Sequence, residues 1–346
     1  MKKVCVIGCF GMGLDLADGQ TVKTRIVSRE LSRVFGKENV IQIDTYGGIK
    51  KIIKLPFLLL GILTKAENIV MLPAENGLRV ITPILVILNK FFNRKLFYDV
   101  IGGWLPSFLE KRTLLRDYLK SFDAIYVETY TMRHQLEEQG FNNVDVIPNC
   151  KDISIISAEE LKETRKKPYK LCTFSRVMKE KGIEDAIEAV IAINEKNDAA
   201  LFELCIYGQI AKGQELWFEN LKSKFPEYIR YKGVIRFDRS TDELKQYDAL
   251  LFPTYYEGEG FAGTIIDAFA SGVPVIASDW KYNSEIIDSG RLGIIIKARN
   301  INDLIQAIES IADNPSAWNN MKRECLCESV KYIPRNAMAK LVDVIR

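Results

Sequence analysis

Short apolar runs rich in valine and isoleucine alternate with longer amphipathic stretches along almost the whole chain. This alternation predicts parallel strands in one sheet, with the intervening helices covering both of its faces. In the first part of the chain, strands are predicted at residues 3–8, 40–43, 68–72, 95–100, 124–127 and 144–147. Helices are predicted between them at residues 21–35, 77–92 and 129–139. The order indicates an α/β fold with a doubly wound sheet.

The alternation is interrupted at Pro148-Asn149-Cys150, and a polar, lysine-rich stretch follows at residues 157–170. It then restarts, with a helix predicted at 182–194 and strands at 169–175, 201–207, 229–231, 249–252, 273–277 and 293–296. A chain of 346 residues is too long for one typical core, so two domains are expected. We predict domains at residues 1–155 and 156–325, and a C-terminal helix at 326–346 that packs back toward the first domain.

Ligands of doubly wound sheets bind beyond the carboxyl ends of the strands. The two Rossmann-like domains are therefore expected to face each other across a cleft lined by the loops after their strands. Helical segments after about residue 301 are expected to close the chain.

The composition is that of a soluble globular protein, with 47% hydrophobic and 27% charged residues. A net charge of only +3 argues against a nucleic-acid partner. The seven cysteines are odd in number and form no Cys-x-x-Cys pair, so reduced thiols in a cytoplasmic protein are expected. No signal peptide and no membrane-spanning helix are predicted.

The stretch at residues 257–268 carries the strongest chemical pattern. Glu259 and Asp267 stand eight positions apart, around a turn with Gly260 and Gly263 that leads into a helix. Free amides at a helix start bind anions, phosphate above all, whereas carboxylates bind the hydroxyls of ribose and sugars. A nucleotide sugar combines both groups. Taken alone, the stretch is equally consistent with an ordinary strand–loop–helix unit whose acids are solvated.

Two cations follow the first predicted strand of the second domain. Arg176 lies just past the strand, and Lys181 lies just before a helix. Both would point into the cleft, where charge-assisted contacts to a diphosphate contribute roughly 1.5–3 kcal/mol each. Taken alone, a solvated run of lysines and arginines is the better interpretation.

The N-terminal loop at residues 8–13 is not a Gly-x-Gly-x-x-Gly loop, and Asp44 comes late for a ribose partner. A dinucleotide oxidoreductase is therefore a weak interpretation. The segment at residues 18–25 begins a helix, where Gly19 and Thr21 suit the close approach of a ligand.

The combination of these motifs resembles glycosyltransferase family 4, a retaining group with GT-B architecture. The resemblance rests on Arg176, the lysine five positions later, Gly182, Glu259-Gly260-Phe261 with its second carboxylate, and residues 271–278. Residues 18–24, 146–149 and 283–287 are similar to the same family, as are Gly290 and Gly293.

The resemblance implies a role for each matching position. Arg176 and Lys181 would hold the donor diphosphate, and Glu259 would act at the donor sugar. The implied donor-binding residues are Gly13, Gly19, Val234, Gly260, Phe261, Ala262, Gly263, Thr264 and Asp267. Asp267 stands where the family usually has glutamate, so its contact with ribose would be shifted or bridged by water.

A second departure concerns the histidine that many relatives carry near the reacting sugar. His134, the only histidine, lies in a polar helix and is expected at the surface. Gly102, Gly103 and Asp99 occupy the segment where the histidine would be expected, and they are the acceptor-side candidates. The retaining route of the family uses no enzyme nucleophile, and we expect no cofactor and no metal ion.

The resemblance implies transfer of a sugar from a nucleoside-diphosphate donor to a saccharide acceptor. Two alternatives stay open. One is a UDP-sugar 2-epimerase, which the single histidine disfavours. The other is a non-catalytic GT-B subunit that orients a true transferase, which Arg176, Lys181 and Glu259 disfavour.

Three apolar stretches edged by basic residues lie in the first domain. Those at residues 50–63 and 108–116 are candidates for peripheral contact with an anionic membrane, whereas that at 84–95 is expected in the core. Contact with the inner face of the membrane would suit a lipid-linked saccharide acceptor of surface-polysaccharide or glycoconjugate synthesis.

Overall fold

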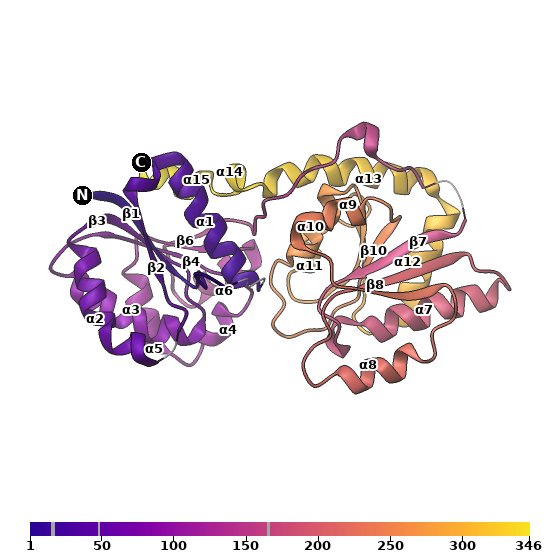
Figure 1. Cartoon of the computed structure of the whole chain (residues 1–346), viewed down its shortest axis with the longest axis horizontal. Helices are drawn as coiled ribbons and strands as arrows, with labels where there is room; N and C mark the ends of the chain where they lie inside the picture. Colours follow the sequence, from indigo (N-terminus) through magenta and orange to yellow (C-terminus); the bar gives the residue numbers. More distant parts are fainter. Residues whose placement is uncertain (15–17, 48, 165–166) are drawn as a thin grey trace. The chain divides into compact units, whose positions relative to one another are not determined.

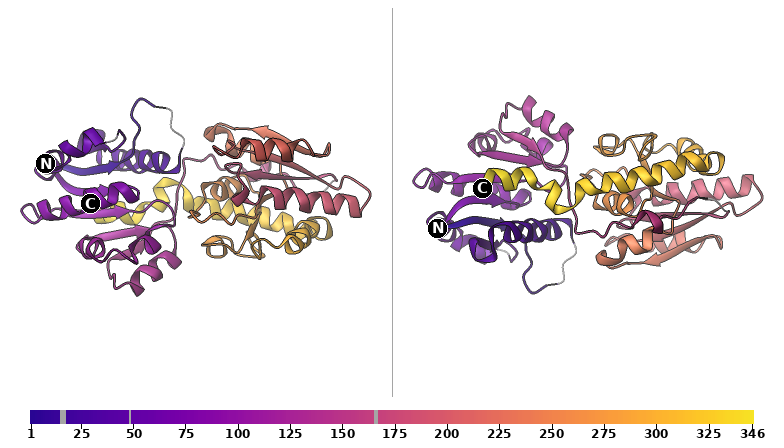
Figure 2. Two further views of the ribbon diagram at one scale, coloured as in Figure 1. Left: turned by 90° about the horizontal axis from the view of Figure 1, so that it is seen from below. Right: turned by 90° about the horizontal axis from the view of Figure 1, so that it is seen from above.

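The computed structural model describes residues 1–14, 18–47, 49–164 and 167–346. These residues form two units. Unit 1 comprises Met1–Asp152 and Tyr332–Arg346, and unit 2 comprises Ile153–Lys331. Figures 1 and 2 show that both ends of the chain lie in unit 1.

Unit 1 is built on a parallel six-stranded sheet with the order β2-β1-β3-β4-β5-β6. Its strands are β1 (Lys2–Gly8), β2 (Val40–Asp44), β3 (Ala66–Met71), β4 (Lys95–Asp99), β5 (Ala124–Val127) and β6 (Val144–Val146). Its helices are α1 (Gly19–Phe35), α2 (Ile49–Leu63), α3 (Glu75–Asn89), α4 (Leu105–Leu109), α5 (Thr113–Lys120), α6 (Tyr130–Glu138), α14 (Pro334–Ala337) and α15 (Ala339–Ile345), with a 3₁₀ turn at Lys37–Asn39.

Unit 2 is built on a second parallel six-stranded sheet with the order β12-β11-β10-β7-β8-β9. Its strands are β7 (Tyr169–Phe174), β8 (Phe202–Tyr207), β9 (Ile229–Gly233), β10 (Ala249–Phe252), β11 (Val275–Ser278) and β12 (Gly293–Ile296). Its helices are α7 (Ile183–Lys196), α8 (Glu215–Lys222), α9 (Ser240–Leu244), α10 (Gly263–Ala270), α11 (Asn283–Ile286), α12 (Ile301–Asp313) and α13 (Pro315–Ser329).

The predicted α/β class is confirmed in both units. Each predicted strand is present, and its ends shift by at most two residues because the apolar runs are slightly longer or shorter than the hydrogen-bonded segments. Helix α2 falls on the apolar stretch at 50–63, which has no clear polar face and so gave no amphipathic pattern.

The last helices of the chain pack in unit 1. Leu341 and Ile345 of α15 are buried in the same core as Val4 and Val6 of β1 and Leu31 of α1. Helices α2, α3 and α5 lie together elsewhere on this unit, since α3 contacts both of the others (Figure 1).

The structure divides the chain after Asp152 and Lys331 rather than at the predicted residues 155 and 325. The predicted second boundary falls inside α13, whose Trp318 and Cys325 are buried in unit 2. Residues 326–331 therefore continue unit 2, and the chain enters unit 1 at Tyr332.

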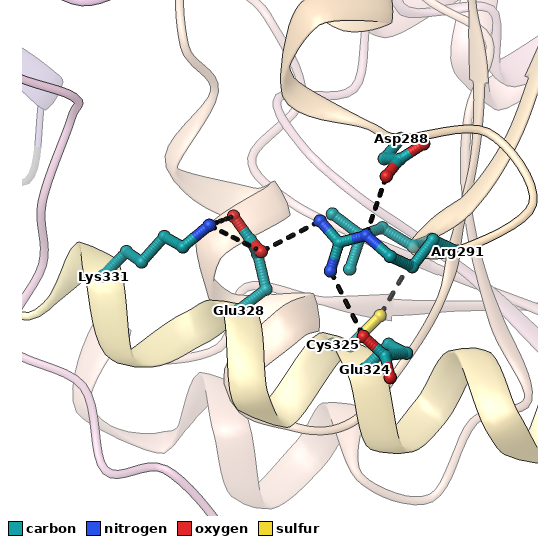
Figure 3. A network of polar contacts seen from close by, with 7 residues as sticks. Asp288, Arg291, Glu324, Cys325, Glu328 and Lys331 are labelled. Atoms are coloured by element: carbon teal, nitrogen blue, oxygen red, sulfur yellow. Dashed lines mark hydrogen bonds and ion pairs between the residues drawn. The ribbon is translucent and has the colours of Figure 1, made fainter.

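An ion-pair network holds the end of α13 in unit 2 (Figure 3). Arg291, after α11, donates to Asp288 at 2.7 Å and to Glu328 at 3.0 Å, and it reaches Glu324 at 3.3 Å. Lys331 also donates to Glu328, at 2.8 Å. Hydrogen bonds to these carboxylates raise the pKa of Arg291. The network fixes the last turn of α13 just before the chain leaves the unit.

Replacement of Leu341 by alanine should destabilise unit 1, although the residue lies only five positions from the end of the chain. Its side chain is fully buried, so the cavity should lower the free energy of unfolding by about 2–5 kcal/mol. Urea denaturation followed by circular dichroism measures this. Val344→Ala is the matched control, because Val344 is 45% exposed and should change stability by less than about 0.5 kcal/mol. Equal effects of the two variants would contradict the packing of α15.

Candidate functional site

The candidate residues of unit 2 lie beyond the carboxyl ends of two neighbouring strands. β7 and β10 pair in parallel, so the loops that follow them meet at one edge of the sheet. Arg176 and Lys181 lie in the segment after β7, and Lys181 ends the 3₁₀ turn Lys179–Lys181. Glu259 lies in the loop between β10 and α10.

Lys181 and Glu259 form a nearly buried ion pair. The lysine Nζ lies 2.6 Å from the glutamate Oε2, and the two side chains are 11% and 7% exposed. The hydroxyl of Thr254 donates to the same oxygen at 2.8 Å. The other glutamate oxygen, Oε1, accepts no hydrogen bond from the residues described. The pair therefore orients the carboxylate while leaving one oxygen available for a ligand.

Two aromatic rings complete the surroundings of the lysine. Its Nζ lies 5.2 Å from the ring centre of Phe252 and 5.1 Å from that of Tyr256. These distances allow cation–π attraction, which stabilises a charge that has lost most of its water. The Lys181 ammonium is thus held at the strand edge by one carboxylate and two rings.

Gly182 is required for this arrangement. Its φ of +68° lies in the left-handed region, and a Cβ atom there would lie 2.2 Å from the carbonyl oxygen of Pro253. The start of α7 can therefore approach the end of β10 only without a side chain. This close approach brings Lys181 within reach of Glu259.

The N-terminus of α10 lies beside the ion pair in the sequence. Ala262 is the extended residue before the helix, and no side chain caps it. Gly263 and Thr264 occupy the first turn and are half-buried, whereas Phe261 is buried. The Thr264 hydroxyl is buried with no hydrogen-bond partner among the described residues. An uncapped helix start with a spare hydroxyl is suited to an anion.

Asp267 lies in the interior, one turn inside α10. It is 2% exposed, and its Oδ1 accepts a hydrogen bond from the Ser240 hydroxyl at 3.0 Å. The structure thus places the second carboxylate in the contact between α9 and α10.

Arg176 and Val234 lie at the surface of unit 2. Arg176 is exposed, and its guanidinium makes no hydrogen bond or ion pair with the residues that the structure describes. Val234 follows β9 and is 66% exposed. Both side chains are accessible to a ligand at the carboxyl edge of the sheet.

Comparison with known proteins identifies the relatives of this unit. A family model described as glycosyl transferases group 1 matches residues 168–314. These residues belong to that family. The match contains Arg176, Lys181, Glu259 and α10, so the site described above lies within the part of the chain that resembles this family.

Curated relatives match between about half and two thirds of the chain. The GtfA subunit of a UDP-N-acetylglucosamine–peptide N-acetylglucosaminyltransferase from Streptococcus parasanguinis is 29% identical over 196 residues, which are 56% of this chain and 37% of that protein. A glycogen synthase from Mycobacterium tuberculosis is 26% identical over 227 residues, 64% of this chain and 54% of that protein. The chain therefore spans about a third to a half of the length of these relatives.

Solved structures show the same fold. HepE from Anabaena, solved in complex with UDP, has a TM-score of 0.77 at 12% identity and covers 100% of this chain and 99% of its own. A likeness at this identity shows the fold alone, which is GT-B.

The remaining predicted site residues lie in unit 1. Gly13 and Gly102 have φ values of +80° and +83°, and Gly19 begins α1. Asp18 caps that helix by accepting from the Thr21 amide at 3.1 Å. Gly103 is half-buried beside Gly102.

Asp99 is in the interior of unit 1 rather than at a binding surface. It is 1% exposed, and its Oδ1 lies 3.2 Å from the Lys23 Nζ, which also lies 3.3 Å from Glu128. Burial lowers the pKa of Lys23, but the two carboxylates outweigh burial and raise it. Burial raises the pKa of Asp99, against the opposing effect of Lys23. The burial of Asp99 argues against direct contact with an acceptor.

Sequence reasoning missed Lys23 and Glu128 as partners of Asp99. Lys23 lies within residues 18–24, which carried the family resemblance, but its spacing gives no sign that it faces the ends of β4 and β5. His134 is at the surface as expected, 74% exposed and 3.5 Å from Glu138.

A hollow of about 520 Å³ that sequence reasoning also missed lies in unit 1. It opens beyond the carboxyl ends of β1 to β4, and its lining combines an indole, a phenol and amides from Trp104, Tyr46, Gln20 and Asn76. Aromatic faces and amides are suited to a sugar ring.

None of the helices in the described parts of the chain is both long and apolar enough to cross a membrane. No group of three histidine, cysteine, aspartate or glutamate side chains among the described residues could hold a metal ion.

Replacement of Lys23 by methionine should leave the buried Asp99 carboxylate without its neighbouring positive charge. The free energy of unfolding should fall by about 3–5 kcal/mol at neutral pH. The Asp99 pKa is already above its ordinary value of 3.8, and without Lys23 it should rise further. The native state of the variant then binds more protons than the unfolded chain. Its free energy of unfolding should therefore rise again as the pH falls from neutrality toward 3.8.

Urea denaturation across this pH range measures the effect. The control is Lys340→Met, because Lys340 is 52% exposed and pairs with Asp145 at the surface. The free energy of unfolding of Lys340→Met should fall by less than about 1 kcal/mol. A constant deficit of Lys23→Met at every pH would contradict the buried-charge interpretation.

Proposed function

We propose that this chain is a retaining glycosyltransferase that moves a sugar from a nucleoside-diphosphate donor to a saccharide acceptor. The observation that carries the proposal is the Lys181–Glu259 pair, 11% and 7% exposed, whose glutamate lies in the loop that leads to the uncapped start of α10. A cation, a carboxylate with a spare oxygen and a helix N-terminus match a diphosphate joined to a sugar.

The leaving nucleoside diphosphate needs its developing charge stabilised. Lys181 and Arg176 supply two cations, and the positive end of the α10 dipole adds a third favourable charge. The free Oε1 of Glu259 is proposed to accept from a hydroxyl of the donor sugar. A donor phosphate oxygen takes the proton of the acceptor on the same face, so no enzyme nucleophile and no metal ion is required.

The donor is proposed to be a UDP sugar. HepE was solved in complex with UDP, and GtfA is named for UDP-N-acetylglucosamine. Val234 is proposed to contact the base and Asp267 the ribose. Because Asp267 already accepts from Ser240 at 3.0 Å, the ribose contact is proposed to involve that hydroxyl or a bridging water.

The acceptor is proposed to bind in unit 1, at Gly102, Gly103 and the hollow beside Trp104. The backbone of the two glycines can approach a sugar closely, and the indole offers it a flat apolar face. We propose a lipid-linked saccharide as the acceptor, used by a cytoplasmic enzyme at the inner face of the membrane.

A second candidate is a non-catalytic GT-B subunit of a transferase complex. The indirect position of Asp267, which reaches a ribose only through Ser240 or a water, and the exposed position of His134 favour it. The intact Lys181–Glu259 pair disfavours it, because a subunit that only orients a partner has little need of a partly buried charge pair.

Thermal-shift measurements with UDP, GDP, ADP and CMP test the donor site. One nucleotide should raise the apparent free energy of unfolding by about 2.7 kcal/mol at a hundred times its Kd. Arg176→Ala should abolish most of this shift without changing the stability of the free protein, because Arg176 is exposed and unpaired among the described residues. Arg230→Ala, on β9 and 54% exposed, should leave the shift intact.

No shift with any nucleotide would contradict the donor site and favour the non-catalytic subunit. Turnover of a UDP sugar by the purified chain alone would exclude that subunit.

A further inference from the structure

Helix α2 is apolar on its outer side as well as on its inner side. Leu59 and Leu63 are fully buried against unit 1. On the opposite side Phe57 is 79% exposed, and Leu58 and Leu60 are each 41% exposed. A helix on a protein surface normally turns a polar face outward, so this outer face indicates a partner that is itself apolar.

The neighbouring helices extend this apolar surface. Stretch 84–95, predicted to pack in the core, does so through Leu85 and Val86 but leaves Ile87 48% and Phe91 82% exposed. Leu114 at the start of α5 is 66% exposed. Because α3 contacts both α2 and α5, these side chains lie on adjoining helices (Figure 1). We call the exposed side chains of α2, α3 with the turn after it, and α5 the outer helical face.

Basic residues accompany the outer helical face. Residues 49–120 contain twelve lysines and arginines but only five acidic residues, whereas the whole chain has a net charge of +3. The exposed cations that form no ion pair within the described parts of this region include Lys65, Arg79, Lys90, Lys95 and Lys111. The charge excess of the molecule is thus concentrated around its largest exposed apolar side chains.

Three of the cations line one hollow. It has a volume of about 360 Å³ between α3 and α5, and Arg79, Lys111 and Arg112 surround it together with Leu114 and Tyr118. The Arg112 guanidinium is held 3.9 Å from the ring centre of Phe108. A fixed guanidinium with two further cations suits a phosphate group, and the exposed leucine beside them suits the chain attached to that group.

We infer that the outer helical face docks on an anionic phospholipid bilayer. Phe57, Leu60 and Phe91 enter the boundary between headgroups and acyl chains, and the cations contact lipid phosphates. A second copy of the chain is disfavoured as the partner, because a symmetric contact would bring two basic faces together. The inference does not depend on the donor site in unit 2.

Sedimentation with vesicles tests the apolar part of the face. The full chain should sediment with vesicles of phosphatidylcholine and phosphatidylglycerol at low salt, and less with phosphatidylcholine alone. Phe57→Ser/Leu60→Ser/Phe91→Ser should bind at least about tenfold more weakly, since each side chain loses several buried methylene equivalents. Leu216→Ser is the control, because Leu216 is 76% exposed on α8 of unit 2.

A second set of variants tests the cations. Arg79→Ala/Lys90→Ala/Lys111→Ala should weaken binding by roughly fivefold for each cation removed. Lys212→Ala/Lys224→Ala removes two exposed lysines of unit 2 and should bind as the unchanged chain does. Both sets should keep the thermal shift with nucleotide, which separates this test from that of the proposed function.

Three results would overturn the inference. The first is an unchanged chain that stays in the supernatant with anionic vesicles. The second is equal sedimentation of the unchanged chain and both sets of variants. The third is a dimer in gel filtration that the serine substitutions dissociate, which would assign the apolar face to a second copy.

Discussion

The contact between Lys181 and Glu259 organises unit 2, because two distant segments must be fixed before these charges can meet. Their atoms lie 2.6 Å apart although the residues are 78 positions apart in the chain. The contact requires β7 to pair with β10 and requires Gly182 to pass the Pro253 carbonyl, which no side chain would permit. A buried pair of this kind contributes little net stability by itself, whereas breaking it leaves an uncompensated charge. The sheet and the glycine thus fix a charge arrangement that is proposed to bind the donor.

The sequence predicts most of the fold and only part of the site. Runs of valine and isoleucine mark the strands, because a parallel strand is buried on both faces. Helix α2 was harder to predict, since apolar residues on all its sides leave no periodic pattern. Lys181 and Glu259 were recognised separately, but their pairing depends on the sheet order, which sequence spacing does not reveal. The inward position of Asp99 depends on Lys23, which lies 3.2 Å away through tertiary packing alone.

The two units place their charges differently. Unit 1 buries Lys23 between two carboxylates, where burial and the neighbouring charges oppose each other, and it leaves other cations exposed near Phe57 and Phe91. Unit 2 keeps its paired charges at a strand edge that a ligand can reach. Buried charges therefore hold the ends of β4 and β5 in unit 1, whereas in unit 2 they are proposed to act on the donor.

Calorimetric titration with UDP of the unchanged chain, Lys181→Met and Glu259→Gln tests the central claim most directly. Lys181→Met should weaken binding by about 10- to 150-fold, since a charge-assisted contact contributes about 1.5–3 kcal/mol. Glu259→Gln should bind UDP at least as tightly as the unchanged chain, because it removes a negative charge beside the diphosphate. Equal weakening by both variants would contradict the account, since it would show that the pair serves only to hold the fold.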